Sequence, residues 1–185
     1  MCLQRHNLVF IFFVLLVFSC KKEQELKSDS YLSTEFGPEG KSYSWASVLF
    51  TSSNPKPIEL TIPAGAVNYT SFVELYQYRV FDQNNLTAFS INGVSNDFYL
   101  LRSNVTELQV PAVMKLPFYY TLNFSVSQGY MPYKVKSDDY TDLMSVLNNA
   151  ANWTPITNFT FDNTTKYLSF EVTDLNAIYL IGKPK

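Results

Sequence analysis

Cysteine and histidine, the side chains that most often serve as nucleophiles, bases and metal ligands, occur only within the first twenty residues. The cysteines are Cys2 and Cys20, and the single histidine is His6. Serine-histidine-aspartate triads, cysteine-histidine dyads and imidazole metal sites all need a histidine in the folded domain. We therefore expect no metal and no cofactor, and Cys20 is the one distinctive nucleophile that remains.

The first nineteen residues have the composition of an export signal. Arg5 gives a positive start, residues 8–18 are apolar, and Ser19 is small. A membrane-spanning helix needs about 18 or more apolar residues, so this run is too short to span. Residues 17–20, Val-Phe-Ser-Cys, resemble the lipobox of bacterial lipoproteins. The alternative is an ordinary secretory leader in which Cys20 has no role.

The lipobox resemblance implies a thioether-linked lipid on Cys20, cleavage before it and acylation of the new amino terminus. Two or more acyl chains anchor a protein stably in a membrane. Residue 21 is Lys, whereas aspartate there retains many lipoproteins in the inner membrane. The resemblance therefore implies an outer-membrane lipoprotein of a Gram-negative bacterium, on the periplasmic or the cell-surface side.

The charge balance excludes a nucleic-acid partner. The chain has 14 Lys and Arg against 16 Asp and Glu, and removal of a signal peptide would also remove Arg5. Nucleic-acid-binding proteins usually carry a basic stripe, and this sequence has none.

Carboxylates are the remaining groups for acid–base chemistry, because paired carboxylates hydrolyse glycosidic bonds when they meet in space. Most of the candidates are expected at outward strand positions, and no sequence signature pairs two of them. They are Glu59, Glu74, Asp97, Glu107 and Glu171. Asp138, Asp139 and Asp142 together could supply calcium ligands, but acids at the start of a helix are more common, and we prefer that interpretation.

Aromatic residues are abundant, with 13 Tyr, 15 Phe and 2 Trp. Two clusters, Tyr76 with Tyr78 and Tyr130 with Tyr133, offer rings on which a sugar could stack, so these four are candidate ligand contacts. The alternative, which we favour, is that the rings fill and border a β core.

Short apolar runs separated by turn residues predict an all-β fold, a β-sandwich. The expected strands cover residues 44–50, 58–62, 72–80, 86–91, 98–101, 107–110, 115–126, 156–161, 167–172 and 178–181. Tyr140, Leu143, Met144 and Leu147 have helical spacing, which predicts one short amphipathic helix that begins at Ser137 or Asp138.

The domain organisation follows from these elements. Residues 1–19 are the expected signal peptide, and residues 20–42, which are polar and contain Gly37-Pro38-Glu39-Gly40, are the expected lipidated cysteine and flexible tether. Residues 43–185 form the sandwich, as one domain or as two packed subdomains, 43–110 and 111–185.

Residues 59–67, Glu-Leu-Thr-Ile-Pro-Ala-Gly-Ala-Val, resemble the hallmark of the ZU-five β-sandwich domain. We expect Pro63 to end a strand, Gly65 to permit a tight turn, and a substitution at Gly65 to cost more stability than one at Gly40. Some members of this family cleave themselves at His-Phe-Ser; here Asp174-Leu175-Asn176 stands in that place, so self-cleavage is not implied.

The sequence thus predicts a non-enzymatic, lipid-anchored binding or scaffold module for adhesion, envelope assembly or capture of a glycan or protein ligand. The alternative is a carboxylate-dependent, glycan-active enzyme.

Overall fold

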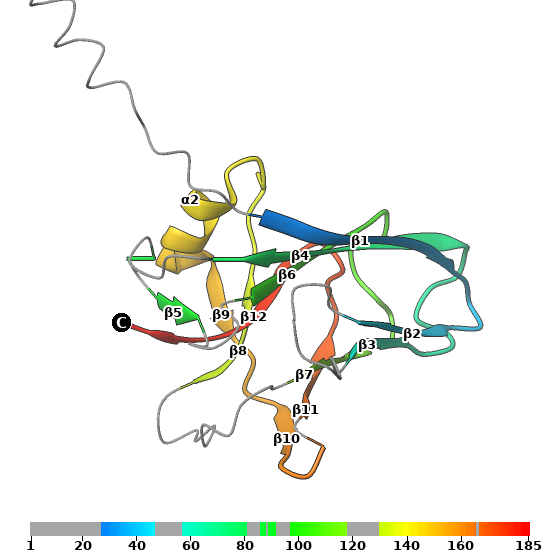
Figure 1. Cartoon of the computed structure of the whole chain (residues 1–185). Coiled ribbons are helices and arrows are strands. Elements are labelled where there is room, and N and C mark those ends of the chain that lie inside the picture. The colour runs from blue at the N-terminus through cyan, green and yellow to red at the C-terminus, as the bar shows by residue number, and fades with distance from the viewer. Residues whose placement is uncertain are drawn as a thin grey trace, which may run out of the picture.

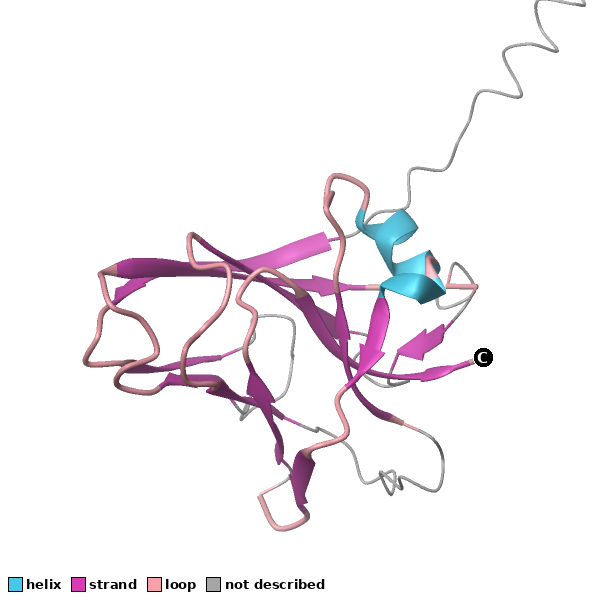
Figure 2. Ribbon diagram, turned by 180° about the vertical axis from the view of Figure 1, so that it is seen from behind, coloured by secondary structure: helices cyan, strands magenta, loops and turns pink. Residues whose placement is uncertain are grey.

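A computed structural model describes residues 27–46, 57–80, 86–87, 89–91, 97–117, 130–165 and 167–185. These residues form two antiparallel sheets in two layers and one short α-helix (Figures 1 and 2). The prediction of an all-β sandwich with one short helix is therefore confirmed. Within the described ranges, no helix is long and apolar enough to cross a membrane.

The larger sheet contains seven strands. In spatial order these are β1 (Lys27–Phe36), β4 (Ser71–Arg79), β6 (Asp97–Ser103), β12 (Ile178–Pro184), β8 (Met131–Val135) and β9 (Trp153–Pro155), while β5 (Phe89–Ile91) pairs with the end of β12.

The smaller sheet contains five strands. Their spatial order is β10 (Phe159–Asp162), β11 (Tyr167–Val172), β7 (Ala112–Pro117), β3 (Pro57–Ile62) and β2 (Lys41–Ala46). The strand expected at 167–172 is confirmed as β11, and its alternation buries Leu168, Phe170 and Val172.

The main hydrophobic core lies between the two sheets. Leu60, Met114 and Phe170 of the smaller sheet belong to the same cluster as Leu75 and Tyr179 of the larger one. Each fully buried side chain of this kind contributes about 1.5–3 kcal/mol by leaving water, so this cluster is the principal source of the domain's stability.

A second core cluster covers the opposite face of the larger sheet. On β6, Tyr99 and Leu101 belong to the main core, whereas Phe98 and Leu100 belong to the second cluster, as the alternation of a strand requires. Helix α2 (Leu143–Asn148) closes this cluster and buries Leu143, Met144, Val146 and Leu147. It is followed by a 3₁₀ turn, η3 (Ala150–Asn152).

The start of the helix differs from the expectation. Asp142 is the N-cap, and its side chain accepts a hydrogen bond from the backbone N–H of Ser145 at 3.0 Å. Ser137 and Asp139 instead bind backbone N–H groups within the preceding loop. Because these local turns occupy the polar side chains before Asp142, neither Ser137 nor Asp138 caps the helix.

The expected flexible tether is wrong from residue 27 onward. Residues 27–36 form β1, which pairs with β4 from Lys27↔Arg79 to Phe36↔Ser71, and residues 41–42 open β2. Phe36 is only 2% exposed and belongs to the main core. The glycines and the proline of residues 37–40 therefore mark a turn between two strands, and residues 20–26 of the expected tether lie outside the described residues.

This turn packs against the turn after β3. Pro63 follows the last residue of β3 and Gly65 has φ +77°, as the sequence predicts, and Ala66 and Val67 are buried. The N–H of Gly65 donates to the carbonyl of Pro38 at 2.7 Å. The geometry predicts the reverse of the expected order of stability losses, because a Cβ on Gly65 meets nothing within 4 Å, whereas one on Gly40 meets backbone.

Two further expectations fail. Residues 107–110 form no strand, because the N–H groups of Leu108 and Gln109 donate to two different segments, at Thr173 and Ala66. Residues 43–110 and 111–185 are not separate subdomains either, since β3 pairs with β7 and β6 pairs with β12. Both halves thus build both sheets.

Candidate functional site

Asn176 ties together the end of β6 and the loop before α2. Its side-chain oxygen accepts the N–H of Ser103 at 2.9 Å, and its side-chain nitrogen donates to the carbonyl of Val105 at 2.6 Å. Its carbonyl accepts the hydroxyl of Tyr140 at 3.1 Å. Since one residue holds both segments, the space between them has a defined shape.

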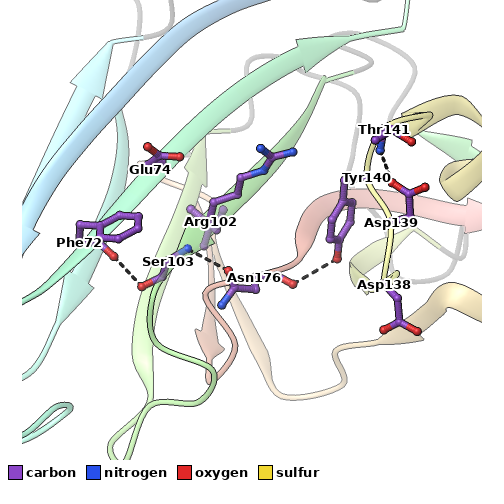
Figure 3. A pocket seen from close by; sticks show the side chains of 10 residues that line it. Phe72, Glu74, Arg102, Ser103, Asp138, Asp139, Tyr140, Thr141 and Asn176 are labelled. Carbon is purple, nitrogen blue, oxygen red and sulfur yellow. Dashed lines mark hydrogen bonds between the residues drawn. The ribbon is translucent and has the colours of Figure 1, made fainter.

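That space is an open hollow of about 480 Å³, which we call the β4–β6 hollow. One wall comes from the two strands, through Phe72, Glu74, Leu101, Arg102 and Ser103. The other comes from the loop before α2, through Asp138, Asp139, Tyr140 and Thr141, and Asn176 completes the lining. In Figure 3, Phe72 and Glu74 lie on one side and the aspartates on the other, with Arg102 between them.

The strand wall follows from alternation along β4. Val73 and Leu75 are buried in the main core, so Phe72, Glu74 and Tyr76 project from the opposite face. Phe72, the second residue of β4, is 37% exposed. The ring is thus available to a ligand in the hollow.

Charged groups on this wall are held by Tyr76. The hydroxyl of Tyr76 donates to Glu74 Oε2 at 3.1 Å, and the guanidinium of Arg102 lies 5.5 Å from the centre of the Tyr76 ring. Glu74 and Arg102 are also direct cross-strand neighbours. A carboxylate and a guanidinium therefore stand side by side at the floor of the hollow.

The loop wall is ordered by its own hydrogen bonds. The N–H of Thr141 donates to Asp139 Oδ1 at 2.8 Å, and this bond lowers the pKa of Asp139. Burial raises the pKa of Tyr140, whose hydroxyl is committed to Asn176. Asp139 therefore presents an ionised carboxylate and Tyr140 a neutral phenol at neutral pH.

Further bonds connect this loop to the main core. Lys136 pairs with Asp174 at 2.6 Å, and the hydrogen bond to that carboxylate raises the pKa of Lys136. The hydroxyl of the buried Tyr179 donates to the carbonyl of Asp174 at 2.6 Å. Residues 174–176 thus connect the hollow to the main core.

The four tyrosines singled out in the sequence do not gather on one surface. Tyr76 and Tyr78 stack on β4 with ring centres 6.4 Å apart and border the second core cluster. Tyr133 is buried in that cluster against Trp153, whereas Tyr130 packs against the main core beneath Lys183. None of the four lines the β4–β6 hollow.

Glu74 is the one candidate for glycoside hydrolysis that lines this hollow. Asp138 and Asp139, which the sequence suggested as calcium ligands, line it as well. Glu59 pairs with Lys115 on the smaller sheet, and Glu107 and Glu171 are exposed elsewhere. Asp97 is buried and is bound by Arg79 and Gln77. Within the described ranges, no three His, Cys, Asp or Glu side chains are grouped to hold a metal ion.

Comparison with protein-family models and with curated proteins gave no match to this chain. Cys20 lies outside the described residues, so its lipidation stays a prediction.

Phe72, Arg102, Ser103 and Asn176 are residues of the hollow that the sequence did not single out. Phe72 does leave a signal: it shares the polar face of its strand with Glu74, while Val73 and Leu75 take the apolar face. Nothing local marks Asn176, because its partners at Ser103 and Val105 are more than 70 residues away along the chain.

Proposed function

We propose that this chain is a lipid-anchored lipoprotein of a Gram-negative outer membrane and acts as a non-catalytic binding module, with its ligand in the β4–β6 hollow. The anchor is the set of acyl chains on Cys20 that the lipobox resemblance implies. The resemblance of residues 59–67 to a ZU-five domain points to the same kind of role, a binding or scaffold module.

The composition of the hollow carries the binding role. It combines the exposed ring of Phe72 with carboxylates, the guanidinium of Arg102 and the hydroxyl of Ser103. Its volume of about 480 Å³ is in the range of small-molecule sites. A sugar can pack its C–H face on an aromatic ring, while its hydroxyls both donate to carboxylates and accept from a guanidinium. Glycan capture is therefore the ligand class that we favour.

The protonation state of the loop wall limits which residue could act as a general acid in hydrolysis. A glycosidase needs one carboxyl group that stays protonated near neutral pH, which requires a raised pKa. The pKa of Asp139 is instead lowered by the N–H of Thr141. Asp139 is therefore unsuited to be the general acid, and the alternative enzyme would need Glu74 or Asp138 in that role.

A glycan array tests the proposal. The mature chain, purified with its lipid in detergent, is applied with the variants Glu74→Gln and Arg102→Ala. Glu171→Gln, an exposed glutamate of the smaller sheet, is the matched control. We expect the wild type and Glu171→Gln to retain the same glycans and the two hollow variants to lose most of that signal.

Two outcomes would contradict the binding module. Retention of no glycan by the wild type would remove the proposed ligand class. New reducing ends, formed when the retained glycan is incubated with the protein and not with Glu74→Gln, would establish the enzyme instead.

A further inference from the structure

A second hollow adjoins the first. It measures about 700 Å³ and is lined by Ser33, Thr34 and Glu35 of β1, Lys41 of β2, and Phe72 and Glu74 of β4. We call it the β1 hollow. The two hollows share Phe72 and Glu74, so the exposed ring of Phe72 stands where they meet.

We propose that the two hollows form one elongated site for a neutral, linear oligosaccharide that crosses Phe72. This inference rests on the proposed function and specifies its ligand. Each hollow alone has the volume of a small-molecule site, and together they offer room for successive sugar units on either side of the ring.

The paired donors and acceptors indicate a ligand rich in hydroxyl groups. In the β1 hollow, Lys41 and Glu35 supply an ammonium and a carboxylate, as Arg102 and Glu74 supply a guanidinium and a carboxylate in the β4–β6 hollow. A hydroxyl both donates and accepts, so it can use both members of each pair. A polyamine or a basic peptide would use the carboxylates alone and would gain no hydrogen bond from Lys41 or Arg102.

The charge balance disfavours an anionic chain. The linings contain four carboxylates, on Glu35, Glu74, Asp138 and Asp139, against two cations, on Lys41 and Arg102. Both cations are engaged: the Lys41 Nζ donates to the carbonyl of Glu35 at 3.1 Å, and Arg102 lies over the ring of Tyr76. An anionic polysaccharide would meet net negative potential along the site.

Chain-length dependence tests the inference. The mature lipid-bearing chain in detergent is titrated calorimetrically with malto-, cello-, xylo- and chito-oligosaccharides of two to six units. Oligogalacturonides of the same lengths and tetralysine serve as anionic and cationic probes. We expect at least one neutral series to bind, with at least a tenfold gain in affinity from two to four units, and both charged probes to bind at least tenfold more weakly.

Variants then locate the chain. Lys41 lines only the β1 hollow and Arg102 only the β4–β6 hollow, so Lys41→Ala and Arg102→Ala should each weaken binding of the tetrasaccharide. Phe72→Ala should weaken it at least tenfold, and Phe72→Leu, which keeps an apolar side chain without a ring, should also weaken it. Tyr69→Ala removes another exposed ring, outside both hollows, and should have no effect. Thermal melts confirm that each variant is folded.

The outcomes separate this inference from the proposed function. Binding that does not depend on chain length, or that responds to only one of Lys41→Ala and Arg102→Ala, would place the ligand in a single hollow. That result would overturn the elongated site and leave the binding module. Preference for oligogalacturonides or tetralysine would overturn the neutral ligand, and binding of no probe would overturn both proposals.

Discussion

Gly40 and Ile62 approach each other so closely that a Cβ atom on Gly40 would lie 2.5 Å from the carbonyl oxygen of Ile62. Gly40 also has φ +75°, a conformation that favours glycine. The turn between β1 and β2 is therefore locked against the turn after β3 at a point where only glycine fits.

Gly40→Ala should consequently destabilise the domain more than Gly65→Ala. Both residues have a positive φ, which costs about 1–2 kcal/mol for alanine, but only Gly40 adds a clash with backbone. We expect a loss of about 3 kcal/mol or more at Gly40 and about 1 kcal/mol at Gly65. Urea unfolding of the two variants measures the difference, and equal midpoints would contradict the packing of the two turns.

Asp97→Ala should be strongly destabilising. The Asp97 side chain is fully buried and accepts bonds from Arg79 at 2.8 Å and from Gln77 at 3.1 Å. Removing one partner of a buried pair costs about 3–5 kcal/mol, and the partial exposure of Arg79 places the expected loss near about 3 kcal/mol. The control is Glu59→Ala, which breaks the more exposed pair with Lys115 and should cost less than about 1 kcal/mol. Similar losses from both variants, in chemical denaturation, would be inconsistent with this difference.

Tyr179 should make the domain sensitive to alkaline pH. Burial raises its pKa far above the ordinary value of about 10, so the folded chain keeps a proton that the unfolded chain releases. Stability is then fully present below pH about 10 and falls above it by about 1.4 kcal/mol per pH unit.

Tyr179→Phe should remove this contribution to the alkaline slope, at a cost of about 1–2 kcal/mol at neutral pH for the lost bond to Asp174. Denaturation curves from pH 8 to pH 11 measure the slope. Tyr69→Phe changes an exposed ring and should follow the wild type; parallel curves for wild type and Tyr179→Phe would disprove the assignment.

The proposed lipoprotein has its lipid on the thiol of Cys20, so Cys20→Ser should abolish lipidation. We expect no incorporation of labelled palmitate and accumulation of an uncleaved precursor. Cys2→Ser, which changes the other cysteine, should be labelled and cleaved like the wild type. Palmitate labelling that persists in Cys20→Ser would refute the lipoprotein prediction.

The sequence predicted those strands whose two faces differ. In β11, Leu168, Phe170 and Val172 alternate with polar or half-buried residues, so the strand and its buried face were both predictable. Strand β1 lacks this contrast in its sequence, where only Tyr31, Leu32 and Phe36 are apolar, and its pairing with β4 joins residues 35–52 positions apart. Such non-local pairing leaves no local pattern in the sequence.

The candidate site was harder to predict for the same reason. Phe72 and Asp139 form opposite walls of one hollow although they are 67 residues apart in the chain. The four candidate tyrosines were selected by residue type, but their rings pack in or against the core clusters. Hydrophobic patterning indicates which face of a strand is buried, and the fold alone decides which outward residues meet.

For a chain lipidated at Cys20, as proposed, the start of β1 at Lys27 limits how far the domain can stand from the membrane. With the lipid on Cys20, only residues 21–26 would form the linker, which would span at most about 20 Å when fully extended. A linker that ended at residue 42, as the sequence predicted, would have reached about 75 Å. Such a module would be confined to a thin layer above the lipid headgroups, where it would meet other proteins of the same membrane at a raised effective concentration. It would be suited to receive a ligand from another protein at the membrane surface, and poorly suited to capture a ligand from free solution.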